Sequence, residues 1–352
     1  MNRVKTWGGG RNNNVDCFRI VLMVMIVAHH ALVHGIGIES IQNEMTLELI
    51  RLPYFVSNAF LTIAVNCFFW ISGYFRIRKN TKKLVEIVTE TMCYVMLINF
   101  LIALCKNEFD LETLFRILKR TMFFWEGYWF ITAYIILMLF APFLNKLIDV
   151  LSTKDKNNLL ITLILVYSIG GFFLQIAGLG NAYSFAQAIY MYLIGAICES
   201  TQLEKTYKKV CYNAAFIVLG VANGVMSYIL ASMGFGRWAW RLFSYNNPIV
   251  VFMSIIICIV VIAQNNDGVI KEKVGKFGKF SLAIYILTDY PMIREYVFAP
   301  LCHIQIIKPY MMLFGIFVYA ISLTAVCIGI DMVRKYLYDK ISERIMFKRV
   351  IL

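Results

Sequence analysis

Long apolar runs separated by short polar gaps repeat along this chain. A helix that crosses a hydrocarbon core about 30 Å thick needs roughly 17–25 mostly apolar residues. Ten windows approach this length, and the sixth and eighth are short. They cover residues 18–36, 54–75, 85–105, 127–148, 158–177, 184–200, 212–233, 248–263, 280–299 and 309–330. The pattern predicts an all-α fold, a polytopic membrane bundle of about ten transmembrane helices.

The gaps between these windows are too short to hold a separate soluble domain. The longest gap, residues 106–126, is amphipathic, and we expect it at the outer interface of the bilayer. Residues 331–352 are predicted to form a basic amphipathic helix at the cytoplasmic surface, and residues 1–17 a basic cytoplasmic N-terminus. Residues 1–352 are therefore predicted to form one integral-membrane domain.

Composition excludes a soluble globular protein. The chain is 60% hydrophobic and only 16% charged, whereas about a quarter of the residues of a soluble domain are charged. The formal charge is +13, but the basic residues lie mostly in the gaps between the windows. If the N-terminus is cytoplasmic, 25 of the 34 Lys and Arg residues fall on the cytoplasmic side. The charge therefore predicts cytoplasmic N- and C-termini, and it gives no reason to expect nucleic acid as a partner.

The first window carries ionisable residues on one predicted helix face. Steps of three and four residues place Asp16, Arg19, His30 and His34 on one stripe. Arg19 and His30 differ by only about 20° in azimuth and by about 16 Å along the axis. Because such residues are costly in lipid, we expect them to line a cavity, unless they only pair with other polar groups inside the bundle.

A metal site is a weaker interpretation of the same histidines. His30 and His34 have the i, i+4 spacing of metal ligands, but only His29 and His303 remain as further histidines. A catalytic zinc usually has three protein ligands, so no metal is predicted. The nine cysteines show no CxxC pattern and predict neither a disulfide framework nor a metal knuckle.

Several motifs, in order, resemble the acyltransferase-3 family, integral-membrane enzymes that acylate, most often O-acetylate, bacterial glycans. Arg19, ten intervening residues and His30, with Asp16 before them, are similar to the first helix of that family. The run "CFFWISGYF", which contains Ser72, resembles its FFxxSG signature and is followed by a basic run. Trp129 begins a segment that resembles the tryptophan-led fourth span.

Two segments depart from the pattern of the family. In "SLAIYILTDYP", Tyr285 matches a late motif, but Thr288 stands where the family usually has a histidine. The third span carries Glu86 and Glu90 in place of a basic segment. We therefore assign the phosphates of the donor to the basic run after the second span, although this run also suits a purely topological role. Its members are Arg76, Arg78, Lys79, Lys82 and Lys83.

Three further positions allow two interpretations each. Ser72, with Gly73, suits either close helix packing or an unwound segment that faces a cavity. Trp129 and Tyr285 suit either the membrane interface or the substrate site. We include Ser72, Trp129, Tyr285 and His34 among the predicted binding residues.

The resemblance implies acyl-CoA, and specifically acetyl-CoA, as the donor substrate, with no permanently bound cofactor, and a glycan hydroxyl as the acceptor. It also implies a multi-pass protein of the plasma (inner) membrane. A neutral histidine can act as general base at pH 7, and His30 is predicted to do so, whereas His29 points about 100° away. Arg19, oriented by Asp16, would bind the donor or polarise its thioester carbonyl. Direct transfer and an acetyl-histidine intermediate both remain open, and the alternative function is a transporter or flippase of a lipid-linked glycan.

Overall fold

The computed structural model describes residues 13–41, 48–176, 179–180, 182–264, 269–298, 300–301 and 308–351, and these form helices and connecting loops without a strand. The α-helices are α1 (Asn13–His30), α2 (Ile38–Ile41), α3 (Leu52–Leu61), α4 (Ala64–Tyr74), α5 (Thr81–Lys106), α6 (Leu111–Met122), α7 (Trp129–Val150), α8 (Thr153–Leu163), α9 (Gly171–Phe173), α10 (Phe185–Thr201), α11 (Lys209–Ser232), α12 (Gly236–Arg241), α13 (Pro248–Ala263), α14 (Val269–Gly275), α15 (Ser281–Asp289), α16 (Pro291–Val297) and α17 (Pro309–Ile351). Two π-helical segments are η1 (Ala31–Ile36) and η4 (Ile164–Gly170). Short 3-10 helices are η2 (Leu49–Arg51), η3 (Phe124–Glu126), η5 (Leu203–Thr206) and η6 (Lys276–Phe280).

Seven helical segments among the described residues are long and apolar enough to cross a membrane, which confirms a polytopic helical membrane bundle. Each coincides with a predicted window: Asn13–Ile36, Leu49–Tyr74, Thr81–Lys106, Trp129–Val150, Thr153–Phe173, Lys209–Ser232 and Tyr310–Lys340. The two short windows are α10, with 17 residues, and α13, with 16. The count of ten crossings and the cytoplasmic placement of the termini stay predictions.

The apolar pattern predicted one helix over residues 280–299, but the structure has two helices there, α15 and α16. Tyr290 has extended backbone angles, φ −64° and ψ 128°, and separates α15 from α16. Pro291 explains the break, because a proline disfavours helical angles in the residue before it and suits the first position of a new helix. The hydroxyl of Tyr128 donates to the carbonyl oxygen of Ile286 at 2.8 Å, which satisfies a carbonyl near the interrupted end of α15.

Two glycines allow α4 and α10 to pack in close contact. A Cβ atom on Gly73 would lie 1.9 Å from the carbonyl oxygen of Tyr192, and one on Gly195 would lie 2.1 Å from that of Trp70. α4 stays helical through Tyr74, and the Ser72 hydroxyl donates to the carbonyl oxygen of Phe68 at 2.8 Å. The structure therefore favours close helix packing over local unwinding at this motif.

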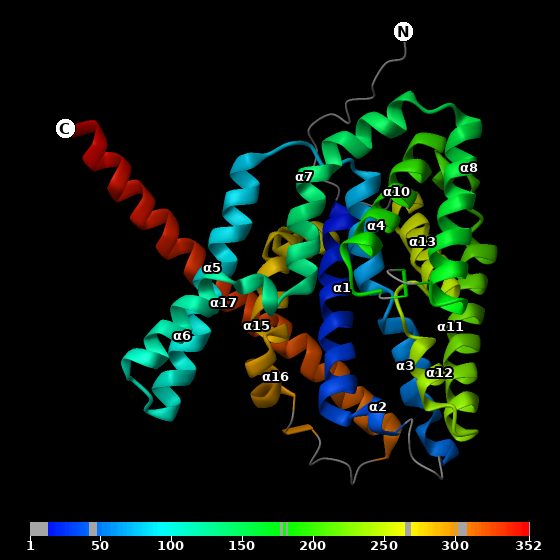
Figure 1. Cartoon of the computed structure of the whole chain (residues 1–352), viewed down its shortest axis with the longest axis horizontal. Helices are drawn as coiled ribbons and strands as arrows, with labels where there is room; N and C mark the ends of the chain where they lie inside the picture. The colour runs from blue at the N-terminus through cyan, green and yellow to red at the C-terminus, as the bar shows by residue number, and fades with distance from the viewer. Residues whose placement is uncertain are drawn as a thin grey trace.

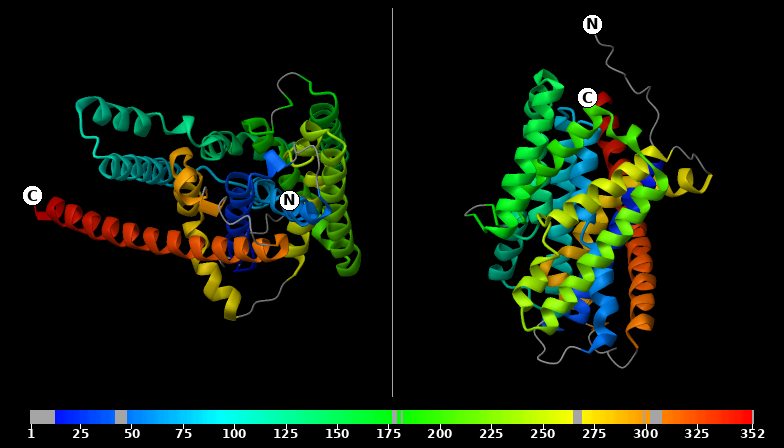
Figure 2. Two further views of the ribbon diagram at one scale, coloured as in Figure 1. Left: turned by 90° about the horizontal axis from the view of Figure 1, so that it is seen from below. Right: turned by 90° about the vertical axis from the view of Figure 1, so that its right-hand side faces the viewer.

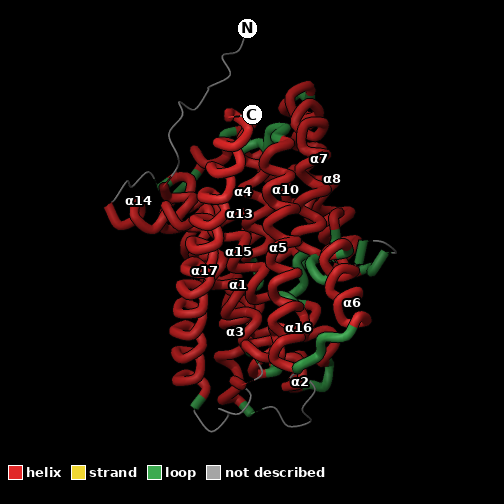
Figure 3. The backbone as a smooth tube through the Cα atoms, turned by 90° about the vertical axis from the view of Figure 1, so that its left-hand side faces the viewer, coloured by secondary structure: helices red, strands yellow, loops and turns green. Residues whose placement is uncertain are grey.

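α1 runs through the middle of the bundle (Figure 1). It contacts α4 and α13 as well as the late helices α14, α15 and α17. The start of α1 and the end of α17 lie toward the same upper end of Figure 1. Figure 2 shows α17 along one edge of the bundle, and Figure 3 shows α14 beside the start of α1. α1 is thus the helix around which segments distant in sequence meet.

The structure describes most of the predicted C-terminal segment but only the last residues of the predicted N-terminal one. α17 continues from Pro309 to Ile351, so residues 331–351 of the predicted tail prolong the helix of the last span. Residues 1–12 of the predicted N-terminal segment and residue 352 lie outside the described residues.

Candidate active site

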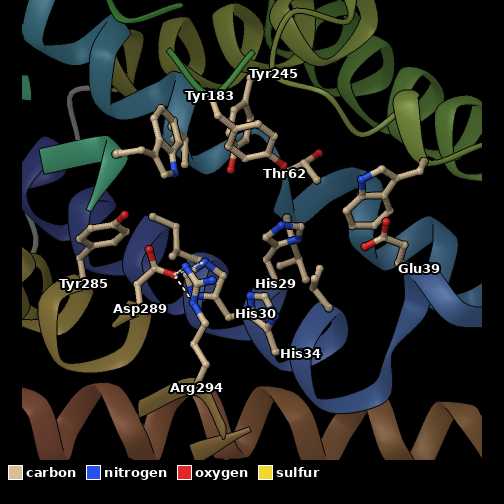
Figure 4. A pocket seen from close by; sticks show the side chains of 16 residues that line it. His29, His30, His34, Glu39, Thr62, Tyr183, Tyr245, Tyr285, Asp289 and Arg294 are labelled. Carbon is tan, nitrogen blue, oxygen red and sulfur yellow. Dashed lines mark hydrogen bonds and ion pairs between the residues drawn. The ribbon is translucent and has the colours of Figure 1, made fainter. Parts of the chain in front are cut away.

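A cavity of about 310 Å³ lies beside the C-terminal half of α1 (Figure 4). Its lining comes from α1, η1 and α2, from α3, α4 and α7, from α12, α15 and α16, and from the loops that contain Tyr183 and Tyr245. The lining residues are Ile26, His29, His30, Val33, His34, Glu39, Leu61, Thr62, Val65, Trp129, Tyr183, Trp240, Tyr245, Tyr285, Asp289 and Arg294. The cavity is thus lined by one arginine, two carboxylates, three histidines and several aromatic rings.

His30 and His34 both line this cavity, as the stripe on the first window predicted. His30 ends α1, and η1 continues from Ala31 as a π-helical segment that contains His34. The centroids of the two imidazole rings lie 5.7 Å apart. A wide π-helical turn is costly in isolation and is frequent at functional sites, so its presence here fits a cavity that α1 helps to form.

His30 faces a buried carboxylate from the far end of the sequence. Its Nε2 lies 3.3 Å from Oδ1 of Asp289, and the side chains are only 12% and 2% exposed. The Nε and an Nη of Arg294 donate to the same oxygen at 3.0 and 2.6 Å. These three side chains form a compact His–Asp–Arg cluster at one end of the cavity (Figure 4).

The contact with Asp289 determines the tautomer of His30. Because a carboxylate oxygen accepts, Nε2 of His30 carries the ring proton, and Nδ1 holds the lone pair of the neutral imidazole. Nδ1 is buried and has no hydrogen-bond partner among the described residues. A neutral imidazole whose other nitrogen is oriented by a carboxylate has the protonation state that a general base requires.

His29 lines the same cavity, although a helix places its side chain about 100° from that of His30. Its Nδ1 lies 2.7 Å from Oδ1 of Asn58, a fully buried residue of α3. The rings of His29 and His30 are 5.9 Å apart between centroids. The adjacent residues His29 and His30 therefore both contribute to the lining.

An aromatic wall closes another side of the cavity. Trp129 stacks on Tyr245 with ring centroids 5.7 Å apart, and Tyr183 lies 5.0 Å from Tyr245. The carbonyl oxygen of Tyr245 accepts from the side-chain amides of Asn66 and Gln187 at 2.9 and 3.0 Å, and both of these residues are fully buried. The structure thus places Trp129 in a rigid aromatic wall of the cavity, and Tyr285 also lines it.

Asp16 and Arg19 form an ion pair at 2.7 Å near the start of α1. Neither lines the cavity, and about 16 Å of helix separates Arg19 from His30. The expectation that Arg19 and His30 face one cavity is therefore not met. Arg294, in α16 just after the break at Pro291, is the arginine of the cavity among the described residues.

Sequence reasoning missed Asp289 and Arg294. The signal was present in "TDYPMIR", where an acid, a proline and a base interrupt an apolar window. Asp289 also lies four residues after Tyr285, on the same predicted helix face. Their pairing with His30 was not visible, because more than 250 residues separate them along the chain.

The basic run after α4 is already partly neutralised. Arg76 adopts a left-handed conformation, φ 54°, and its guanidinium lies 3.3 Å from Asp149 and 3.2 Å from Glu199. Lys83 pairs with Glu86 at 3.5 Å. The remaining members, Arg78, Lys79 and Lys82, are exposed.

Lys79 borders a second cavity, of about 230 Å³, between the start of α5 and α7. Within the described ranges, His, Cys, Asp and Glu side chains form no group of three that would hold a metal ion. His303 lies outside those ranges.

Comparison with known proteins gives one result. The acyltransferase-3 family model, described as an acyltransferase domain, matches residues 12–332. Neither the curated proteins nor the solved structures give a significant match. The family match spans nearly the whole chain, including α1 and the His–Asp–Arg cluster, so the chain belongs to the acyltransferase-3 family and is an acyltransferase of the membrane type.

Proposed function

We propose that this protein transfers an acetyl group from acetyl-CoA to a hydroxyl of a cell-surface or lipid-linked glycan at the plasma membrane. The observation that carries the proposal is the unpaired, buried Nδ1 of His30, whose ring is held by Asp289 at the wall of a cavity. The family match supports acyl transfer in general, and the aromatic wall supports a sugar as the acceptor.

In the proposed reaction, Nδ1 of His30 accepts the proton of the sugar hydroxyl as its oxygen attacks the thioester carbonyl. The tetrahedral intermediate then collapses, the carbon–sulfur bond breaks, and the proton on Nδ1 passes to the leaving thiolate. The products are the acetyl ester and CoA, and His30 returns to its starting state. A positioned general base of this kind contributes about 10²–10⁴-fold to the rate.

Asp289 orients the ring of His30 and stabilises the imidazolium that forms during the reaction. Arg294 holds the carboxylate of Asp289 through two donors and compensates its burial. As a cation in the cavity wall, Arg294 also lowers the energy of the oxyanion that develops on the thioester carbonyl. This assigns to Arg294 the electrostatic role that the sequence suggested for Arg19.

Arg19 and the basic run keep a proposed role in binding the donor. The ion pair of Arg19 with Asp16 is near the start of α1, at the end that we predict to face the cytoplasm. CoA phosphates held at Arg19 would extend the pantetheine arm along α1 toward His30, about 16 Å farther. The exposed Arg78, Lys79 and Lys82 are the alternative site for the phosphates. The acceptor would then enter from the opposite side of the membrane.

The test uses detergent-purified protein and acetyl-CoA labelled in the acetyl group, with membrane glycan from the source cells as acceptor. The proposal predicts label on the glycan, and loss of that label in His30→Ala. A transporter or flippase predicts no label on any acceptor. Sealed vesicles of known orientation test the sidedness, since acetyl-CoA on the cytoplasmic face should label a glycan that is accessible only from the other face.

A further inference from the structure

His29 also lines the cavity, but it has no role in the transfer reaction proposed above. It lies next to His30 in α1, and the two ring centroids are 5.9 Å apart. Its partner Asn58 is fully buried, and the distance from Nδ1 of His29 to Oδ1 of Asn58 is 2.7 Å.

The contact with Asn58 determines which nitrogen of His29 is offered to the cavity. A carboxamide oxygen only accepts hydrogen bonds, so Nδ1 of the neutral ring carries the proton. Nε2 then holds the lone pair and accepts a hydrogen bond from a donor in the cavity. A sugar hydroxyl is such a donor.

In the proposed reaction, the two histidines supply two acceptor atoms from neighbouring rings of one wall. Nδ1 of His30 takes the proton of the reacting hydroxyl, and Nε2 of His29 is free to accept from a second one. Ring centroids 5.9 Å apart are compatible with hydrogen bonds of about 2.8 Å each to two hydroxyls on neighbouring carbons of one sugar ring. Figure 4 shows Tyr183 and Tyr245 across the cavity, where their flat rings would contact the apolar face of that sugar.

We propose that His29, held by Asn58, selects acceptors in which the reacting hydroxyl has a neighbouring hydroxyl, that is, vicinal diols. This inference rests on the proposed function, because it requires transfer at His30. The second hydroxyl keeps its proton, is not acylated, and orients the first toward Nδ1 of His30. An acceptor that lacks it leaves the acceptor atom of His29 unpaired and loses that orientation.

The experiment compares cis-1,2-cyclohexanediol with cyclohexanol as acceptors for the purified full-length protein, with acetyl-CoA as donor. We expect kcat/KM for the diol, corrected for its two hydroxyls, to exceed that for cyclohexanol by about tenfold, the effect of one hydrogen bond. In His29→Leu this ratio should fall to near one. His29→Gln, whose amide oxygen also accepts, should keep part of it.

Thr62→Val is the matched control. Thr62 lines the same cavity, but its hydroxyl already donates to the carbonyl oxygen of Ala59 at 3.3 Å, so its loss should leave the ratio at the wild-type value. If His29→Leu does not purify as a folded protein, Asn58→Leu gives a second measurement. Without its partner, the ring of His29 populates both neutral tautomers, and the ratio should fall.

The outcomes separate this inference from the proposed function. Equal kcat/KM for the two alcohols, in wild-type protein that still consumes acetyl-CoA, overturns the diol selection and leaves the transferase standing. A preference that persists unchanged in both His29→Leu and Asn58→Leu overturns the assignment to His29. Failure of the wild-type protein to consume acetyl-CoA counts against the proposed function itself.

Discussion

Replacement of Asp289 by asparagine tests the His–Asp–Arg cluster most directly. The substitution keeps the shape of a side chain that is 2% exposed and removes its charge. During the reaction, the imidazolium of His30 would lose an attraction of about 5 kcal/mol, for charges 3.3 Å apart at an effective dielectric constant of about 20. Arg294, whose Nη lies 2.6 Å from the same oxygen, offsets part of this attraction. We therefore expect kcat to fall by about 10²–10³-fold.

The same substitution also affects stability, because it leaves the guanidinium of Arg294 without its carboxylate. Breaking a buried ion pair costs about 3–5 kcal/mol, and the 28% exposure of Arg294 places the expected cost at or below the lower end of this range. The double variant Asp289→Asn/Arg294→Gln removes both charges. It should recover much of the thermal stability without recovering the rate.

Asp331 provides a matched control. It is also 2% exposed, and it pairs with Arg334 and accepts from the hydroxyl of Tyr94 at 2.6 Å, outside the cavity lining. Asp331→Asn should lower the thermal unfolding temperature in a similar way but change kcat little. The assay is the initial rate of acetyl transfer, alongside thermal unfolding in detergent. A kcat for Asp289→Asn within threefold of wild type, in protein that is folded, would refute the role of Asp289.

Three further predictions concern the base, the packing and the topology. His30→Ala should lower the transfer rate by about 10²–10⁴-fold, whereas His29→Ala should be milder, as measured with labelled acetyl-CoA; equal rates for the two variants would contradict the assignment of the base. Gly73→Ala should lower the thermal unfolding temperature strongly, because the new Cβ would lie 1.9 Å from the carbonyl oxygen of Tyr192, and an unchanged temperature would show that α4 and α10 separate easily. Reporter fusions at residues 110 and 240 should report an extracytoplasmic location and a fusion at 205 a cytoplasmic one, and an inverted pattern would reverse the predicted orientation.

The sequence alone determined the helical membrane architecture and one wall of the site. Hydropathy and helical periodicity are local properties, so the apolar windows and the stripe with His30 and His34 follow from residues close together in the chain. Pro291 was a local signal that the single window over residues 280–299 did not use, although the rule for residues before proline predicts the break that divides α15 from α16. The motif around Gly73 indicated close packing as one of two interpretations, and its contact with α10 favours that one.

Only the tertiary structure decided the partners in the site. Asp289 meets His30 because α15 packs beside α1, and Arg294 joins them from α16, which packs on α15. Asn58 meets His29 because α3 packs on α1. Arg19, on the same stripe as His30, pairs instead with its neighbour Asp16 about 16 Å away. A stripe gives the direction of each side chain but not what lies opposite it, since that depends on how helices distant in sequence share the space around α1.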